Sequence, residues 1–273
     1  MSSSTLKRLV KMTIKRAALT IGRFTPRLRG SRILTYHSVG FRLHEMNVQP
    51  DRFREQMTWL AKHHPCITLG QAASGAHGVA ITFDDGYTDN LHVAAPILRE
   101  LNIPFTVFMV AGRAGGLLAH DTDLETSRIM TWDEVRAVEA GGGEVGGHTM
   151  THARLSRLNE DEQRREIGEC ARVLARELGE RPRPFAYPYG SAADFNETSQ
   201  RLVREMGFTL AVSNRYGANT SNADLWALRR IWIDETDTLA MFQAKVDGRL
   251  DLLSALETPA ALWGRRTLNR LSA

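Results

Sequence analysis

Short apolar runs alternate with amphipathic segments along most of the 273-residue chain. The apolar runs have the length and composition of β-strands, and the segments between them place apolar residues at helical spacing. We expect strands at residues 32–37, 79–85, 105–110, 143–148, 183–188, 208–213 and 228–233. We expect helices at residues 51–63, 89–102, 132–142, 159–179 and 196–207. The pattern therefore predicts a series of strand–helix units.

Such a series predicts parallel strands joined by helical crossovers. The last four helical stretches end in Asn or Gly, as helices often do, and the stretch at 159–179 begins with Asn and acidic residues. Six or seven units in about 215 residues have the size of a (β/α) barrel slightly short of the eight-fold version. We expect an α/β fold, a distorted (β/α)7-type barrel, with a single catalytic domain.

Both ends of the chain are basic. The first 32 residues carry nine Lys and Arg residues and no acid. They contain no apolar stretch typical of a signal peptide, and the chain has no run of about 18 apolar residues to span a bilayer. The segment "LKRLVKMTIKRAALTIG" predicts an amphipathic helix on an anionic membrane surface, and the alternative is a solvated basic extension. The tail "ALWGRRTLNRLSA" repeats the pattern, with Trp263 as an interface anchor.

We therefore expect a basic amphipathic segment at 1–30, a catalytic domain at 31–248 and a basic tail at 249–273. The 42% hydrophobic and 24% charged fractions are those of an ordinary globular protein. Two cysteines make no disulfide framework, and we expect a cytoplasmic location, peripheral on the inner face of the membrane. We expect no nucleic-acid partner, because the basic ends accompany no helix-turn-helix, zinc-finger or RNA-binding signature.

Polar residues of catalytic type follow the expected strands at their carboxyl ends. Catalytic groups of (β/α) barrels lie at these ends. The residues are His37, Asp84, Asp85, His148, His152 and the segment 187–190. Their positions predict an active site at one end of the barrel.

His148 and His152 are four residues apart, a spacing that can present both imidazoles to one point. Two imidazoles and one carboxylate make a divalent metal site of the zinc or iron type. One of the adjacent acids Asp84 and Asp85 would hold the cation, and the other would be a general base for water. The cation would also remove the repulsion between the two carboxylates.

The motifs "TFDDGY", "HTMTH" and "FAYPYG", in this order, resemble the polysaccharide deacetylase family (NodB homology, carbohydrate esterase family four). The resemblance extends over roughly residues 31–245, most of the chain. The segments "RILTYHSVG", "PILRELNIPFTVFMV", "MTWDEVRAV" and "LRRIWID" are similar to the branch that deacetylates poly-N-acetylglucosamine and related exopolysaccharides.

The resemblance implies a role for each motif residue. Asp84 would be the catalytic base, and Asp85, His148 and His152 would hold the metal, usually zinc. The family's oxyanion donor is a backbone N–H in the third motif, which falls at Tyr189.

The general acid is a histidine in this family, and most members place it in a late "LxH" motif. No histidine follows His152 in this chain. In the exopolysaccharide branch the histidine comes from the first strand, a position that His37 matches. The resemblance therefore assigns His37 the general acid, and the alternative is a hydrogen-bonded histidine at a strand end.

One position departs from the family pattern. The third motif often begins with an arginine that orients the base, and Ala186 stands there in this chain. Arg230 is a candidate substitute, and the alternative for Arg230 is an ordinary surface ion pair.

We expect a metal-dependent N-deacetylase that releases acetate from an acetamido sugar in a polysaccharide or lipid-linked glycan. The cation would be Zn²⁺, with Co²⁺, Ni²⁺ or Fe²⁺ as other candidates. The alternative is a catalytically silent homologue that binds glycan or membrane. No sequence pattern specifies the sugar, its carrier or the oligomeric state.

Overall fold

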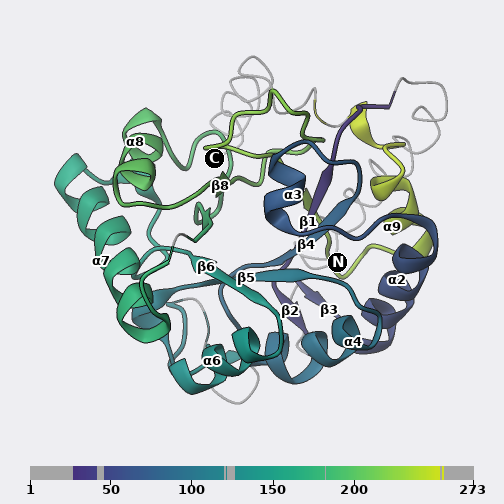
Figure 1. Cartoon of the computed structure of the whole chain (residues 1–273), viewed down its shortest axis with the longest axis horizontal. Coiled ribbons are helices and arrows are strands. Elements are labelled where there is room, and N and C mark those ends of the chain that lie inside the picture. The colour runs from purple at the N-terminus through teal and green to yellow at the C-terminus, as the bar shows by residue number, and fades with distance from the viewer. Residues whose placement is uncertain are drawn as a thin grey trace, which may run out of the picture.

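The computed structural model describes residues 27–41, 46–119, 121, 127–181, 183–252 and 254. Seven parallel strands form a curled sheet, and helices cover its outer face (Figure 1). The sheet order is β8-β7-β6-β5-β4-β1-β9. The strands are β1 (Arg32–Tyr36), β4 (Val79–Phe83), β5 (Phe105–Met109), β6 (Glu144–Gly147), β7 (Phe185–Ala186), β8 (Ala211–Val212) and β9 (Ile231–Trp232). The predicted distorted (β/α)7-type barrel is confirmed.

The barrel is distorted where β8 meets the segment before β9. The backbone N–H of Ala211 donates to Leu225, the N–H of Leu228 donates back to Ala211, and that of Ser213 donates to Leu228. The last three strands have only two residues each, although the sequence predicted six-residue strands there. The chain leaves the sheet early at these strands and forms turns at the carboxyl end of the barrel.

Alternate residues of the long strands belong to two different apolar cores. Leu34 and Phe83 pack outward in the large cluster that the helices cover. Ile33 and Ala80 belong to a second cluster on the inner face of the sheet. Because successive strand residues point to opposite faces, strands buried on both sides consist of nearly continuous apolar residues.

The helices begin with side-chain caps that the sequence provides. Capping boxes at Thr131, Asn159 and Asn196 satisfy the first backbone N–H groups of three long helices. The helices are α2 (Pro50–His63), α3 (Leu69–Ala73), α4 (Ala95–Glu100), α6 (Trp132–Ala140), α7 (Glu160–Leu178), α8 (Glu197–Glu205) and α9 (Leu239–Val246). All five predicted helical stretches are present, with a π-helical turn preceding α4. The helices α3 and α9, and the small strands β2 (Ser38–Val39) and β3 (Asn47–Val48), were not predicted.

A buried ion pair joins the two ends of the described chain. Both guanidinium nitrogens of Arg32 lie 2.8 Å from the carboxylate oxygens of Asp251. Gly248 has a φ of 77°, and a Cβ there would lie 2.4 Å from the Arg32 guanidinium. Only glycine adopts this conformation without strain and leaves room for the pair.

Most of the expected segment 1–30 and of the tail 249–273 lies outside the described residues. These boundaries, the membrane contact and the cytoplasmic location therefore stay predictions. Among the described residues, no helix has the length and apolar character needed to cross a membrane.

We expect Asp251→Asn to destabilise the protein by about 3–5 kcal/mol, because it leaves the Arg32 guanidinium buried without its counter-charge. The matched control is Glu100→Gln, which removes the exposed ion pair with Arg54. That change should cost less than about 1 kcal/mol. Urea unfolding followed by circular dichroism measures both, and equal small losses would contradict the interpretation.

Candidate active site

The expected catalytic residues meet at the carboxyl ends of neighbouring strands. His37 follows β1, Asp84 and Asp85 follow β4, and His148 follows β6. The sheet ladder continues into these residues. The N–H of Asp84 donates to Tyr36 at 3.0 Å, and the N–H of His148 donates to Met109 at 2.8 Å. The barrel therefore fixes the backbone at Asp84 and His148.

The backbone is strained around these residues. Five described non-glycine residues have positive φ, and four of them lie in the three motifs. These four are Asp85, Thr149, His152 and Tyr189. Gly86 also has positive φ, and a Cβ there would lie 2.2 Å from the sulfur of Met109. Left-handed backbone is costly outside glycine and clusters where geometry matters for function.

Asp85, His148 and His152 form a compact cluster. Each offers one ligand atom, and these atoms all lie within 4.8 Å of one another. Oδ1 of Asp85 lies 3.6 Å from Nε2 of His148 and 3.3 Å from Nε2 of His152. These are the three residues that the family resemblance assigns to the metal.

A hydrogen bond on the far side of His148 fixes its tautomer. Nδ1 of His148 donates to the carbonyl of Ala186 at 2.7 Å, because a carbonyl can only accept. In the neutral ring Nε2 then carries a lone pair that faces the Asp85 carboxylate. Two acceptors facing each other repel unless a cation lies between them, and two imidazoles with one carboxylate suit a divalent metal. The residues present therefore fit a metal ion.

Asp84 makes a different contact, although it adjoins Asp85. Both of its oxygens accept hydrogen bonds from Arg230, each at 2.7 Å. Asp84 and Arg230 are 1% exposed, which excludes the alternative of a surface ion pair for Arg230. Arg230 also donates to the carbonyl of Ser213 at 2.9 Å and to the hydroxyl of Thr82 at 3.2 Å. These contacts hold the guanidinium in one orientation inside the barrel.

The charges around Asp84 keep it ionised. Burial by itself would raise the pKa of Asp84, but the nearby Arg230 guanidinium, with His148 and His37, outweighs burial and holds the pKa well below its usual range. Asp84 is therefore an unprotonated carboxylate at neutral pH.

His37 is buried beside the same carboxylates. Burial lowers the pKa of His37, and the charges of Asp85 and Asp84 raise it without cancelling that effect. Its Nδ1 is buried and makes no hydrogen bond with any described residue. Its ring centroid lies 5.9 Å from that of Trp232, the last residue of β9. The strand-end rule applied to β9 would have identified Trp232, which the sequence analysis missed.

Tyr189 lies at the exposed side of the cluster. Its ring is 48% exposed, with its centroid 4.9 Å from that of His152. The guanidinium of Arg154 lies 4.3 Å from the Tyr189 ring centroid, a contact that no sequence pattern predicted. The backbone N–H of Tyr189 donates to none of the described residues, whereas its carbonyl accepts from Asn214. This N–H is available to a ligand.

Residues 71–211 match the family model for polysaccharide deacetylase, a span of just over half the chain. The chain belongs to the polysaccharide deacetylase family. YxkH of Bacillus subtilis, assigned to the same enzymes, is 25% identical over 79% of this chain and 75% of its own length. The poly-β-1,6-N-acetyl-D-glucosamine N-deacetylase of Staphylococcus aureus is 23% identical, over 69% of this chain and 68% of that protein.

Two solved structures have a similar fold. IcaB from Ammonifex degensii superimposes with a TM-score of 0.69 at 24% identity, covering 82% of this chain and 98% of that one. The Streptococcus pyogenes deacetylase PplD, in complex with acetate, gives a TM-score of 0.68 at 21% identity over 81% and 99% of the two chains. The family resemblance predicted from the motifs is confirmed.

We expect the protein to bind one divalent cation per chain and His148→Ala to weaken this binding. The loss should exceed the roughly 10–100-fold that removal of a supporting residue costs. Zinc titration of chelator-treated protein by calorimetry measures it. The control is His92→Ala, which changes an exposed histidine paired with Glu134. Undiminished zinc binding by His148→Ala would refute the assignment.

Proposed function

We propose that this chain is a metal-dependent hydrolase that removes N-acetyl groups from an acetamido sugar in a polysaccharide or lipid-linked glycan and releases acetate. Membership of a family of hydrolytic deacetylases supports the reaction. The name of the Staphylococcus aureus relative supports an N-acetylglucosamine polymer as substrate. The observation that carries the proposal is the contrast between two adjacent buried acids. Asp84 is held by Arg230, and Asp85 faces His148 and His152.

Asp85, His148 and His152 would hold the cation, with Zn²⁺ first among Zn²⁺, Co²⁺, Ni²⁺ and Fe²⁺. When bound, a divalent cation supplies Lewis-acid chemistry, because it polarises a carbonyl and makes water more acidic. The second nitrogen of His148 bonds to the Ala186 carbonyl and so orients the imidazole toward the site.

Asp84 is the general base in this proposal. Its negative charge and its position beside Asp85 let it accept a proton from the attacking water. The two hydrogen bonds from Arg230 fix the plane of the carboxylate. Arg230 thus takes the place of the motif arginine, whose position is occupied by Ala186. Arg230 is therefore a positioning residue, because its guanidinium acts through Asp84.

His37 is the general acid in this proposal. Burial favours the neutral imidazole in the free protein, so His37 must take up a proton before it can protonate the leaving nitrogen. The charges of Asp84 and Asp85 favour that uptake. The buried Nδ1, which has no hydrogen bond among the described residues, does not fit a purely structural strand-end histidine.

The backbone N–H of Tyr189 is the proposed donor to the oxyanion. Stabilisation of developing negative charge by a fixed N–H is among the largest contributions to acyl-transfer catalysis.

The alternative function is a catalytically silent homologue that binds glycan or membrane. Such a homologue would not need an ionised carboxylate beside three residues that can hold a metal ion. Release of acetate distinguishes the two.

We expect Asp84→Asn to lower acetate release from β-1,6-linked N-acetylglucosamine oligomers by about 10²–10⁴-fold, because an amide cannot accept the proton. Zinc binding should persist, since Asp84 is not a ligand. An enzymatic acetate assay and a zinc titration measure the two effects. Asp133→Asn, at an exposed site on α6, is the control. Near-normal turnover by Asp84→Asn would overturn the base assignment.

We expect Arg230→Lys to lower kcat by about 100-fold with little change in KM, because lysine keeps the charge but cannot grip both oxygens of Asp84. Arg229→Lys, one residue away and bonded to the Tyr216 carbonyl, is the matched control.

Combining Arg230→Lys with Asp84→Asn shows whether Arg230 affects activity by positioning Asp84 or by another route. If Arg230 acts through Asp84, the double variant should be no slower than Asp84→Asn alone. A further loss comparable to that of Arg230→Lys alone would show that Arg230 acts by another route.

A further inference from the structure

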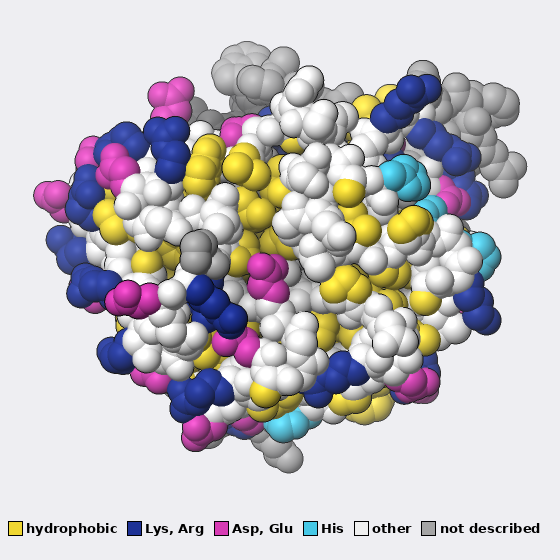
Figure 2. All heavy atoms as spheres, in the orientation of Figure 1, with side chains coloured by type: hydrophobic (Ala, Val, Ile, Leu, Met, Phe, Trp, Pro, Cys, Tyr) yellow, Lys and Arg dark blue, Asp and Glu magenta, His cyan; other side chains and the backbone are white. Residues whose placement is uncertain are grey.

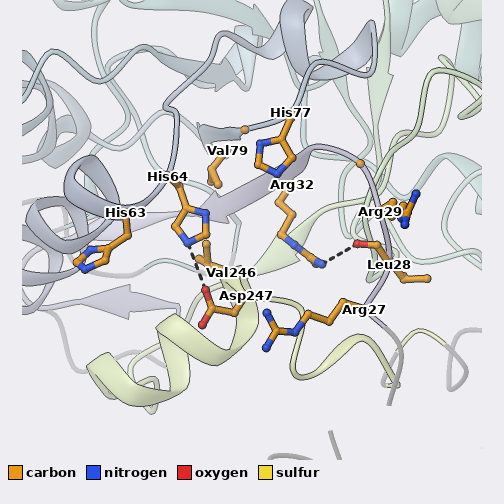
Figure 3. Close-up of a pocket in the computed structure, with 12 residues that line it drawn as sticks. Arg27, Leu28, Arg29, Arg32, His63, His64, His77, Val79, Val246 and Asp247 are labelled. Carbon is orange, nitrogen blue, oxygen red and sulfur yellow. Dashed lines mark hydrogen bonds and ion pairs between the residues drawn. The ribbon is translucent and has the colours of Figure 1, made fainter. Parts of the chain in front are cut away.

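A cavity of about 660 Å³ lies at the opposite end of the barrel from Asp84. Its walls include the first residues of β1 and β4, Arg32 and Val79, and the ends of α2 and α9 (Figure 3). Residues 27–30 form a further wall. Each of the strands β1 and β4 has five residues, or about 17 Å. That distance separates this cavity from the catalytic residues.

The charges around this cavity are predominantly positive. Histidine side chains gather with Lys and Arg side chains on the right of the molecule, near α2 and α9 (Figure 2). The acid in the wall, Asp247, is already paired with His64 and Arg249. Arg32 is neutralised by Asp251. The local excess of positive charge therefore comes from other side chains.

Arg27 and Arg29 supply the excess, and His77 lines the same cavity. None of the three makes a hydrogen bond or ion pair with another described residue. Arg27 and His77 lie on opposite sides of the cavity, and Arg29 lies at its edge (Figure 3). None of the described residues therefore occupies their donors.

The segment that carries the two arginines is held in place. The N–H of Leu28 donates to Asp251 at 2.7 Å, and Arg32 donates to the Leu28 carbonyl at 3.2 Å. Ser31 exchanges two backbone hydrogen bonds with Asn219, at 2.8 and 2.9 Å. The backbone at residues 28–31 is therefore preformed, and an anion would not have to order it.

The sequence that precedes Arg27 carries no negative charge. Residues 1–26 carry six Lys and Arg residues and no acid. Residues 1–26 therefore offer no counter-charge to Arg27 and Arg29.

We propose that this cavity binds a phosphate-bearing anion through Arg27, Arg29 and His77. Guanidinium groups match phosphate oxygens bidentately, and the volume suits a small phosphorylated group. The phosphate belongs either to a lipid headgroup or to a soluble phosphate ester. Because the cavity is remote from the catalytic residues, the ligand binds there without reacting. The inference goes beyond the proposed function and does not depend on it.

Calorimetric titration with inorganic pyrophosphate tests the proposal on the full chain without any turnover. The test variant is Arg27→Ala/Arg29→Ala. Both positions are exposed, so we expect the variant to fold like the wild type. The control is Arg172→Ala/Arg176→Ala, which removes the same charge from the exposed face of α7. We expect the test variant to bind pyrophosphate at least about tenfold more weakly and the control to match the wild type.

Sedimentation with phosphatidylcholine vesicles, with and without phosphatidylglycerol, identifies the source of the phosphate. A lipid headgroup is indicated if the protein binds the anionic vesicles, pyrophosphate displaces this binding, and the test variant loses it. Pyrophosphate binding without vesicle binding indicates a soluble phosphate ester. No binding of either probe, or equal losses in the test and control variants, would overturn the proposal.

Discussion

Two adjacent carboxylates buried at 1% exposure impose the main electrostatic constraint on this protein. Burial of a charge is costly unless a counter-charge or a metal compensates it. Asp84 and Asp85 receive different compensation. Arg230 holds both oxygens of Asp84, whereas Asp85 faces the two imidazoles of His148 and His152. This difference turns one acidic pair into a candidate base and a candidate metal ligand.

The curled sheet makes this arrangement possible. Strand β1 lies between β4, which Asp84 follows, and β9, which follows Arg230. The Arg230 side chain crosses the inner face to reach Thr82 and Asp84, while the carbonyl of Ser213 holds its Nε. The closure of the barrel therefore orients the Asp84 carboxylate, although position 186 carries alanine.

The motif residues could be predicted because each group lies within a few residues of a strand end, where a (β/α) barrel collects its catalytic side chains. Arg230 was a candidate from the sequence, but its contact with Asp84 could not be predicted in the same way. It is 146 residues from Asp84, and alternation along a strand sends either Arg229 or Arg230 inward. Only the register of β9 against β1 decides which one. The short helices α3 and α9 were missed because brief apolar segments carry little periodicity.

The central claim is that Asp85 binds the metal while Asp84 stays on Arg230. Anomalous diffraction at the zinc edge, from crystals of the zinc-loaded protein, tests it directly. The account predicts one strong peak about 2.0–2.2 Å from Asp85, His148 and His152, with both Asp84–Arg230 bonds intact. A peak bonded to Asp84, or a zinc ion held away from this cluster, would contradict it.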